Sequence, residues 1–224
     1  MIIPDIAREE KLFQKGYRNI AGIDEAGRGP LAGPVVAAAV VFANSSAMKE
    51  LVKIGIRDSK TLPFKKREYL YDIIVEECED WSVSSVSEDV IDQINILQAT
   101  KLAMKNAVNG LKLKPDFLLI DGNFTLENYP VSQLAIPKGD RTVFSVSAAS
   151  IIAKVTRDRI LIGLDKEYPE YGFAQHKGYG TKMHVDRLMK KGPCKLHRKT
   201  FSPVDKYFSV GKALNSDAEN KLAK

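Results

Sequence analysis

Apolar residues recur along this chain in two spacings, and the shorter spacing marks strands. One run, residues 35–42, is continuously apolar, and another, residues 81–87, alternates apolar side chains with serine. Such runs predict strands, and the continuous one is typical of a strand that is covered on both faces of its sheet. The predicted strands occupy residues 20–24, 35–42, 81–87, 117–120 and 132–137.

The longer spacing, three or four residues, marks helices. Ser87 followed by Glu88 and Asp89 has the composition of a helix start, because a capping hydroxyl and acidic side chains favour the helix N-terminus. Strands come first and then alternate with helices, which predicts an α/β fold with a mixed sheet and helices on both faces. The predicted helices span residues 63–80, 87–110, 145–168 and 181–191.

Length and composition predict a single soluble domain with a tail. The chain has 224 residues, 44% hydrophobic and 28% charged, which is typical of globular proteins. We expect one folded domain over residues 1–204 and a C-terminal tail over 205–224. No apolar run is long enough to span a membrane, and the N-terminus lacks the order of a signal peptide. Two cysteines are too few for a disulfide framework, so we expect reduced thiols in a cytoplasmic protein.

Charge is distributed unevenly. The formal net charge is +6, which suits a polyanionic partner. Residues 71–100 carry eight acidic side chains and no Lys or Arg, whereas residues 171–200 carry eight basic side chains and one acidic one, Asp186. Either run alone is typical of a solvated helix face. Together they suggest an oriented field, with a basic helical segment over 171–200.

Four carboxylates follow apolar runs where the chain turns. They are Asp24, Glu25, Asp121 and Asp140. A single Asp after a strand is usually a turn or cap residue, but several gathered at one sheet edge would form a site. Side chains alternate along a strand, so Asp24 and Glu25 share that site only if the strand is already turning at Glu25. Clustered carboxylates favour hard cations such as Mg²⁺ or Mn²⁺, and two such ions can promote hydrolysis of a phosphodiester.

A glycine loop follows the first two carboxylates. Residues 27–33 spell Gly-Arg-Gly-Pro-Leu-Ala-Gly, a pattern that fits neither a dinucleotide-binding fingerprint nor a Walker A loop. It is either a structural turn or a loop whose exposed amides, with the guanidinium of Arg28, contact a nucleic-acid backbone.

These motifs resemble those of bacterial ribonuclease HII. The resemblance starts with Asp24-Glu25-Ala26-Gly27-Arg28-Gly29-Pro30 and continues, in order, through further blocks between about residues 18 and 204. Those blocks are Asp58-Ser59-Lys60, Ile120-Asp121-Gly122, Lys138-Gly139-Asp140, residues 148–159, residues 176–181, His197-Arg198 and Phe201-Ser202-Pro203.

The resemblance implies a ribonuclease H-like fold with a mixed five-stranded sheet flanked by helices and a helical C-terminal region. It implies an endonuclease that cuts the RNA strand of RNA/DNA hybrids and incises duplex DNA 5′ to single embedded ribonucleotides, leaving 3′-hydroxyl and 5′-phosphate ends. The implied metal ligands and catalytic residues are Asp24, Glu25, Asp121 and Asp140, holding two Mg²⁺ or Mn²⁺ ions. Gly27, Arg28 and Gly29 would sense the ribose 2′-hydroxyl, and Tyr179 would pack on the adjacent deoxyribose.

Other polar residues in the matched blocks stay outside the predicted site. Asp158 lies mid-helix between two arginines, which favours ion pairing. The three histidines, His176, His184 and His197, show no zinc-ligand spacing, and His197 either contacts phosphate or supports local structure. Lys60 and Ser150 receive only weak substrate or structural roles.

Two alternatives remain open. A ribonuclease HIII-like enzyme would share the carboxylates, but that family carries an extra N-terminal domain and lacks the Gly-Arg-Gly pattern. A non-catalytic hybrid-binding protein would keep the basic surface without the acids. We expect a monomer. A sliding-clamp contact through the aromatic pair near residues 204–208 is a weak prediction beside a packed terminus.

Overall fold

The computed structural model describes residues 3–43 and 45–208. Most of the predicted tail, residues 209–224, lies outside the described residues. The strands are β1 (Ile20–Ala26), β2 (Val35–Phe42), β3 (Asp80–Val86), β4 (Phe117–Asp121) and β5 (Ser132–Ile136). The helices are α1 (Ala7–Gln14), α2 (Ser45–Ile54), the 3-10 turn η1 (Ser59–Thr61), α3 (Phe64–Glu77), α4 (Glu88–Asn109), α5 (Gly139–Thr142), α6 (Phe144–Leu164), α7 (Phe173–His176) and α8 (Lys182–Lys191).

The five strands form one mixed sheet in the order β3-β2-β1-β4-β5. Strands β1, β2 and β3 pair antiparallel, and β4 and β5 continue the sheet parallel to β1. All eight residues of β2 are buried, which confirms that the continuously apolar run is covered on both faces. The predicted mixed sheet flanked by helices is therefore confirmed.

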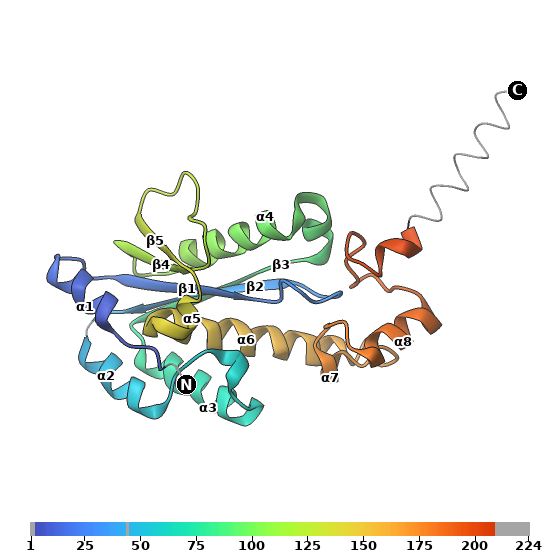
Figure 1. The fold of residues 1–224 in the computed structure, drawn as a ribbon, viewed down its shortest axis with the longest axis horizontal. Helices are drawn as coiled ribbons and strands as arrows, with labels where there is room; N and C mark the ends of the chain where they lie inside the picture. Colours follow the sequence, from blue (N-terminus) through green and yellow to red (C-terminus); the bar gives the residue numbers. More distant parts are fainter. Residues whose placement is uncertain (1–2, 44, 209–224) are drawn as a thin grey trace, which may run out of the picture.

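Helices cover both faces of the sheet (Figure 1). Helix α4 packs on one face over Ile23 and Val41, and helix α6 packs on the other over Ala38 and Phe42. Helix α6 is buried along most of its length because it packs between the sheet and α3, and α2 contributes Met48 and Leu51 to the same apolar core. The basic segment folds as α7 and α8 at one end of the sheet, which confirms the helical C-terminal region.

Four helices, α1, α2, α5 and α7, and the 3-10 turn η1 were absent from the sequence-based expectations, and other helices differ in extent. Helices α5 and α7 are four residues long, too short for an apolar periodicity. Helices α1 and α2 are short, and each buries only two side chains, so their apolar spacing gives a weak signal. Helix α6 begins at Phe144 and ends at Leu164, before the predicted end at 168, and the chain continues as a turn over residues 165–167.

Helix α4 is interrupted at Asn95, where the sequence predicts a continuous helix. Asn95 has a φ of 64°, and its side-chain oxygen accepts hydrogen bonds from the backbone N–H of Leu97 at 3.0 Å and of Gln98 at 3.1 Å. The asparagine therefore caps a second helical segment, and an apolar periodicity that continues across the break conceals it. Within the described ranges, no helix is both long and apolar enough to cross a bilayer.

Candidate active site

Three predicted carboxylates meet at one edge of the sheet. Asp24 lies near the end of β1, Asp121 ends the neighbouring parallel strand β4, and Asp140 lies in the first turn of α5, just after β5. Parallel strands deliver their C-terminal ends to the same edge, which explains the convergence. One carboxylate oxygen from each of the three residues lies within 4.8 Å of the others.

Glu25 follows Asp24 but lies outside this triad. Strand β1 does not turn at Glu25, because its pairing with β2 continues to Ala26 opposite Val36. Alternation therefore directs the Asp24 and Glu25 side chains to opposite sides of the strand. The Glu25 carboxylate pairs with the Arg28 guanidinium at 3.4 Å, and it still interacts electrostatically with Asp121.

The site disfavours negative charge in the free protein. Burial raises the pKa of Asp24 well above its usual value, and repulsion from Glu25 and Asp121 adds to the effect. Burial likewise raises the pKa of Asp121, and repulsion from Asp140 adds to the effect. One Asp24 oxygen, Oδ2, is buried with no hydrogen-bond partner. A divalent cation would satisfy this oxygen and neutralise the cluster, and an all-oxygen ligand set suits Mg²⁺ or Mn²⁺.

Lys60, to which the sequence analysis assigned only a weak role, lies in the candidate site. Its ammonium group lies 3.2 Å from Asp140 Oδ2. Burial opposes its charge, but attraction from Asp24 and Asp140 outweighs burial and raises the pKa of Lys60 above its usual value. Asp58 accepts a hydrogen bond from the Lys60 N–H at 2.9 Å and so shapes the turn that carries it. The Asp58-Ser59-Lys60 block was the available signal.

Ser150 has a structural role in the same region. Its hydroxyl lies 2.8 Å from the Ser59 hydroxyl, and both side chains are buried. The contact joins η1 to α6 beside the acidic cluster.

Asp158 lies outside the site, as predicted, and is engaged in ion pairs. Its partners are Lys154 at 2.6 Å and Arg67 at 3.5 Å rather than the adjacent arginines. Arg159 instead pairs with Glu68, and Arg157 points into the protein.

The glycine loop, residues 27–33, lies between β1 and β2 and is contacted by the loop that carries Tyr179. The Leu31 N–H donates to the Gly178 carbonyl at 2.8 Å, and a Cβ on Gly178 would overlap the Ala32 carbonyl oxygen. Arg28 and Gly29 are exposed, and the Tyr179 ring is 40% exposed. The predicted substrate-contacting residues are thus gathered on adjoining loops, next to the strand end that carries Asp24.

The three histidines form a buried cluster instead of a phosphate-binding surface. His197 is 1% exposed, and its Nε2 lies 3.1 Å from Nε2 of His184. The His184 Nδ1 donates to the Tyr179 carbonyl at 2.9 Å. Of the two roles predicted for His197, the structure agrees with support of local structure and not with phosphate contact.

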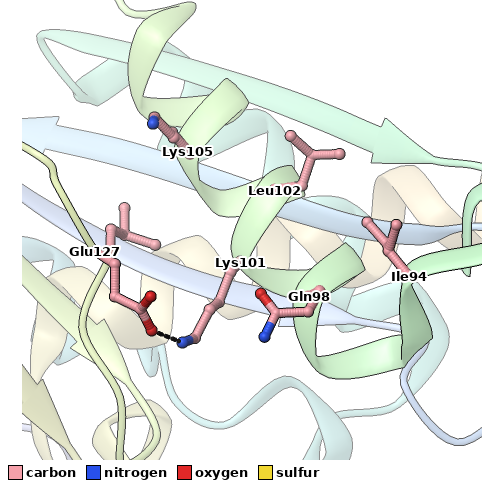
Figure 2. A pocket seen from close by; sticks show the side chains of 7 residues that line it. Ile94, Gln98, Lys101, Leu102, Lys105 and Glu127 are labelled. Carbon is pink, nitrogen blue, oxygen red and sulfur yellow. Dashed lines mark hydrogen bonds and ion pairs between the residues drawn. The ribbon is translucent and has the colours of Figure 1, made fainter.

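A cavity of about 400 Å³ lies elsewhere, beside the outer surface of α4 (Figure 2). Its lining includes Leu102, Lys105 and a Lys101–Glu127 ion pair. Glu127 is the one carboxylate in this lining, so the cavity does not contain an acidic cluster comparable to the triad.

Comparison with known proteins identifies the family. The family model described as Ribonuclease HII matches residues 21–204. Ribonuclease HII of Caldicellulosiruptor bescii is 53% identical over 193 residues, which cover 86% of this chain and 91% of the relative.

Solved structures agree with this family. The ribonuclease H2 of Pyrococcus horikoshii has a TM-score of 0.71 at 31% identity, covering 84% of this chain and 96% of that one. The ribonuclease HII of Archaeoglobus fulgidus, solved as a complex with PCNA, has a TM-score of 0.68 at 28% identity and covers 82% of this chain and 95% of that one. The chain belongs to the ribonuclease HII family and is a type 2 ribonuclease H, an endonuclease of RNA/DNA hybrids.

Proposed function

We propose that this enzyme, besides cutting the RNA strand of hybrids, incises duplex DNA on the 5′ side of single embedded ribonucleotides. The reaction would use two divalent cations and leave 3′-hydroxyl and 5′-phosphate ends. The observation that carries the proposal is the location of the Asp24–Asp121–Asp140 triad next to two adjoining loops that bear Arg28, Gly29 and Tyr179.

Asp24, Asp121 and Asp140 would hold the first cation, because their oxygens already lie within mutual ligand distance. Glu25 would complete the set for the second cation only after its side chain reorients, because in the free protein it starts on the other side of β1 from Asp24 and pairs with Arg28. When bound, Mg²⁺ or Mn²⁺ supplies charge that activates a water molecule and stabilises the leaving oxygen. Lys60 adds a positive charge beside Asp140, where a substrate phosphate would approach.

Selectivity for a ribonucleotide would come from the two loops. A protein distinguishes RNA from DNA at one nucleotide through the 2′-hydroxyl, which both donates and accepts hydrogen bonds. The exposed backbone at Gly29 permits close approach, since a Cβ placed there would contact nothing within 4 Å. The Tyr179 ring, flanked by the Lys154 ammonium at 5.4 Å and the Arg157 guanidinium at 5.8 Å, offers a flat surface for the neighbouring sugar.

The test of the metal ligands is Asp121→Asn. We expect cleavage of an RNA/DNA hybrid to fall by about 10³-fold or more, because the change removes one charged ligand from the triad. Hybrid binding should change by no more than about threefold, since the basic surface is intact.

Thermal unfolding supplies a second readout that is independent of activity. In chelator the variant should melt above the wild type, because it lacks one of the repelling carboxylates. Added Mg²⁺ or Mn²⁺ should raise the melting temperature of the wild type more than that of the variant. Cleavage at the wild-type rate would show that the site is wrongly assigned.

We also propose that the enzyme is a cytoplasmic monomer. A sliding-clamp contact through the residues near 204–208 finds support in the clamp complex of the archaeal relative. Against it, Val204 is buried and the Tyr207 hydroxyl donates to the Leu188 carbonyl at 3.1 Å, so this segment is partly packed on the domain. Size-exclusion chromatography with light scattering, with and without a clamp, separates these states.

A further inference from the structure

Two buried arginines lie under the glycine loop. Arg157, on α6, and Arg198, after α8, are fully buried, and neither forms an ion pair with a carboxylate within residues 3–43 and 45–208. Burial lowers the pKa of Arg157 to about 10, and burial together with repulsion from Arg157 lowers the pKa of Arg198 to about 9. A buried charge without a carboxylate is costly, so each guanidinium must find its stabilisation in hydrogen bonds.

All of those hydrogen bonds go to main-chain carbonyls, and all but one go to residues 27–34. Arg198 donates to the carbonyls of Gly27 at 2.6 Å, Arg28 at 3.0 Å and Gly33 at 2.8 Å. Arg157 donates to the carbonyls of Ala32 at 3.1 Å and Pro34 at 2.9 Å.

Arg157 also connects the glycine loop to the tyrosine loop. Its third hydrogen bond is to the Lys177 carbonyl at 2.9 Å, two residues before Tyr179. The Arg198 N–H donates to the Leu31 carbonyl at 2.8 Å, which ties the loop to the segment after α8 as well. The Arg157 side chain therefore bridges the two loops, in addition to the direct hydrogen bond between Leu31 and Gly178, and the Arg198 side chain holds the glycine loop alone.

The orientation of these carbonyls determines which way the amides face. In a trans peptide the C=O and the following N–H point in opposite directions. Because the carbonyls of Gly27 and Arg28 point inward to Arg198, the N–H groups of Arg28 and Gly29 point away from it. Neither N–H has a main-chain acceptor among the described residues.

We propose that Arg157 and Arg198 are positioning residues for ribonucleotide recognition: by holding the loop carbonyls inward, they present the Arg28 and Gly29 amides outward to the 2′-hydroxyl and its phosphate. This rests on the proposed function. Lysine cannot replace either residue, because one ammonium group cannot span three carbonyls with the fixed fork of a guanidinium. The same packing explains why residue 27 is a glycine, because a Cβ at this position would overlap the Arg157 side chain.

The test compares two substrates in Arg157→Lys and Arg198→Lys. An all-RNA strand offers a 2′-hydroxyl at every position, whereas a single ribonucleotide offers one. We expect kcat/KM for the single-ribonucleotide duplex, divided by kcat/KM for the hybrid, to fall about tenfold or more in each variant. The control is Ile74→Ala, which opens a cavity in the core under α3, away from the loop. Each protein is assayed at the same interval below its own melting temperature. Under these conditions the control should keep the wild-type ratio of the two kcat/KM values.

A ratio within about twofold of the wild type in both lysine variants would overturn the proposal. If these variants do not fold, amide hydrogen exchange decides, measured on the free wild-type enzyme and on the Asp121→Asn variant with bound duplex. The Arg28 and Gly29 amides should exchange rapidly in the free enzyme and become protected when Asp121→Asn binds the single-ribonucleotide duplex. Protection already in the free enzyme would contradict the proposal. A wild type that leaves this duplex uncut would instead count against the proposed function.

Discussion

At the scale of single residues, two glycines of one loop have different structural roles. Gly27 has a φ of 98° and no room for a side chain, whereas Gly29 has neither constraint. A methyl group at the first position must disturb the fold, and at the second it can only disturb what approaches from outside.

Gly29→Ala therefore tests substrate approach without a folding penalty. We expect a free energy of unfolding equal to that of the wild type or higher by up to about 1 kcal/mol, since alanine restricts the unfolded chain. Cleavage of the single-ribonucleotide duplex should fall about tenfold or more, because the added methyl displaces the backbone contact. Urea unfolding and initial rates measure the two effects.

Gly27→Ala is the matched control and should lose about 2 kcal/mol or more, through the overlap with Arg157 and the positive φ. Full activity in Gly29→Ala would remove the loop backbone from the substrate interface.

Tyr179 is the second residue whose proposed role is separable from folding, because its ring is partly exposed. Tyr179→Ala should lower cleavage of the single-ribonucleotide duplex about tenfold or more, since the stacking surface is lost. The all-RNA hybrid should be affected less, and Tyr179→Phe, which keeps the ring, should behave like the wild type. Equal losses on both substrates in Tyr179→Ala would refute junction sensing.

The sequence predicted which carboxylates gather at the candidate site better than it predicted their local geometry. Acids after apolar runs predicted Asp24, Asp121 and Asp140, because the C-terminal ends of parallel strands converge. The same logic does not determine the orientation of Glu25, which depends on where β1 stops pairing with β2. The contacts of Arg157 and Arg198 were likewise inaccessible, since backbone carbonyls as partners have no sequence pattern.

At the scale of elements, the segments around α7 and α8 are joined by the histidine cluster. His184 donates from Nδ1 to the Tyr179 carbonyl, so its Nε2 accepts from the His197 Nε2–H at 3.1 Å. His197 Nδ1 then accepts from the Cys194 N–H at 3.0 Å. Every ring in this chain of hydrogen bonds is neutral, and an added proton would place two N–H groups against each other.

This arrangement predicts a loss of stability in acid. Burial lowers the pKa of His184 and of His197 to about 4, below the value of about 6.5 in an unfolded chain. As the pH falls below 6.5 the unfolded state binds protons first, so stability is lost. One such histidine accounts for about 2 kcal/mol between pH 6.5 and pH 5.

Thermal unfolding of the wild type and of His184→Asn across this range measures the effect. The variant should show the shallower decline, because it lacks one titrating group. Carboxylates with raised pKa values oppose the trend equally in both proteins, so the difference isolates the histidine. Parallel curves would contradict the neutral cluster.

The element-scale predictions succeeded where burial is extensive. The strands and the helices α3, α4, α6 and α8 had strong apolar patterns, and the structure contains all of them. Helix α1 is held differently: the buried Glu9 carboxylate accepts a hydrogen bond from the Ser145 N–H at 2.9 Å. A buried acid weakens the amphipathic pattern that would have predicted this helix.

At the scale of the whole molecule, the acidic and basic segments meet. Asp92 accepts hydrogen bonds from the Lys199 N–H at 2.8 Å and the Thr200 N–H at 2.9 Å, and Asp89 lies 3.6 Å from the Lys199 ammonium. Some acidic side chains of residues 71–100 thus bind the basic segment within the fold. Lys182, Lys190 and Lys191 of α8 remain exposed for a polyanion.

Hybrid binding should therefore weaken steeply as salt rises, because phosphate contacts release counterions. The double change Lys190→Gln and Lys191→Gln should reduce the slope of log Kd against log salt by up to about 2. Lys53→Gln, on α2 at the other end of the molecule from α8 (Figure 1), is the control and should leave the slope unchanged. A slope that is equal in all three proteins would show that α8 does not contact the substrate.

The most direct test of the whole account is cleavage of duplex DNA that contains one ribonucleotide, assayed in chelator, in Mg²⁺ and in Mn²⁺. The account predicts no cleavage in chelator and a single cut 5′ to the ribonucleotide with either cation, yielding a 3′-hydroxyl and a 5′-phosphate. Efficient metal-dependent cutting of a long hybrid together with an intact single-ribonucleotide duplex would contradict it.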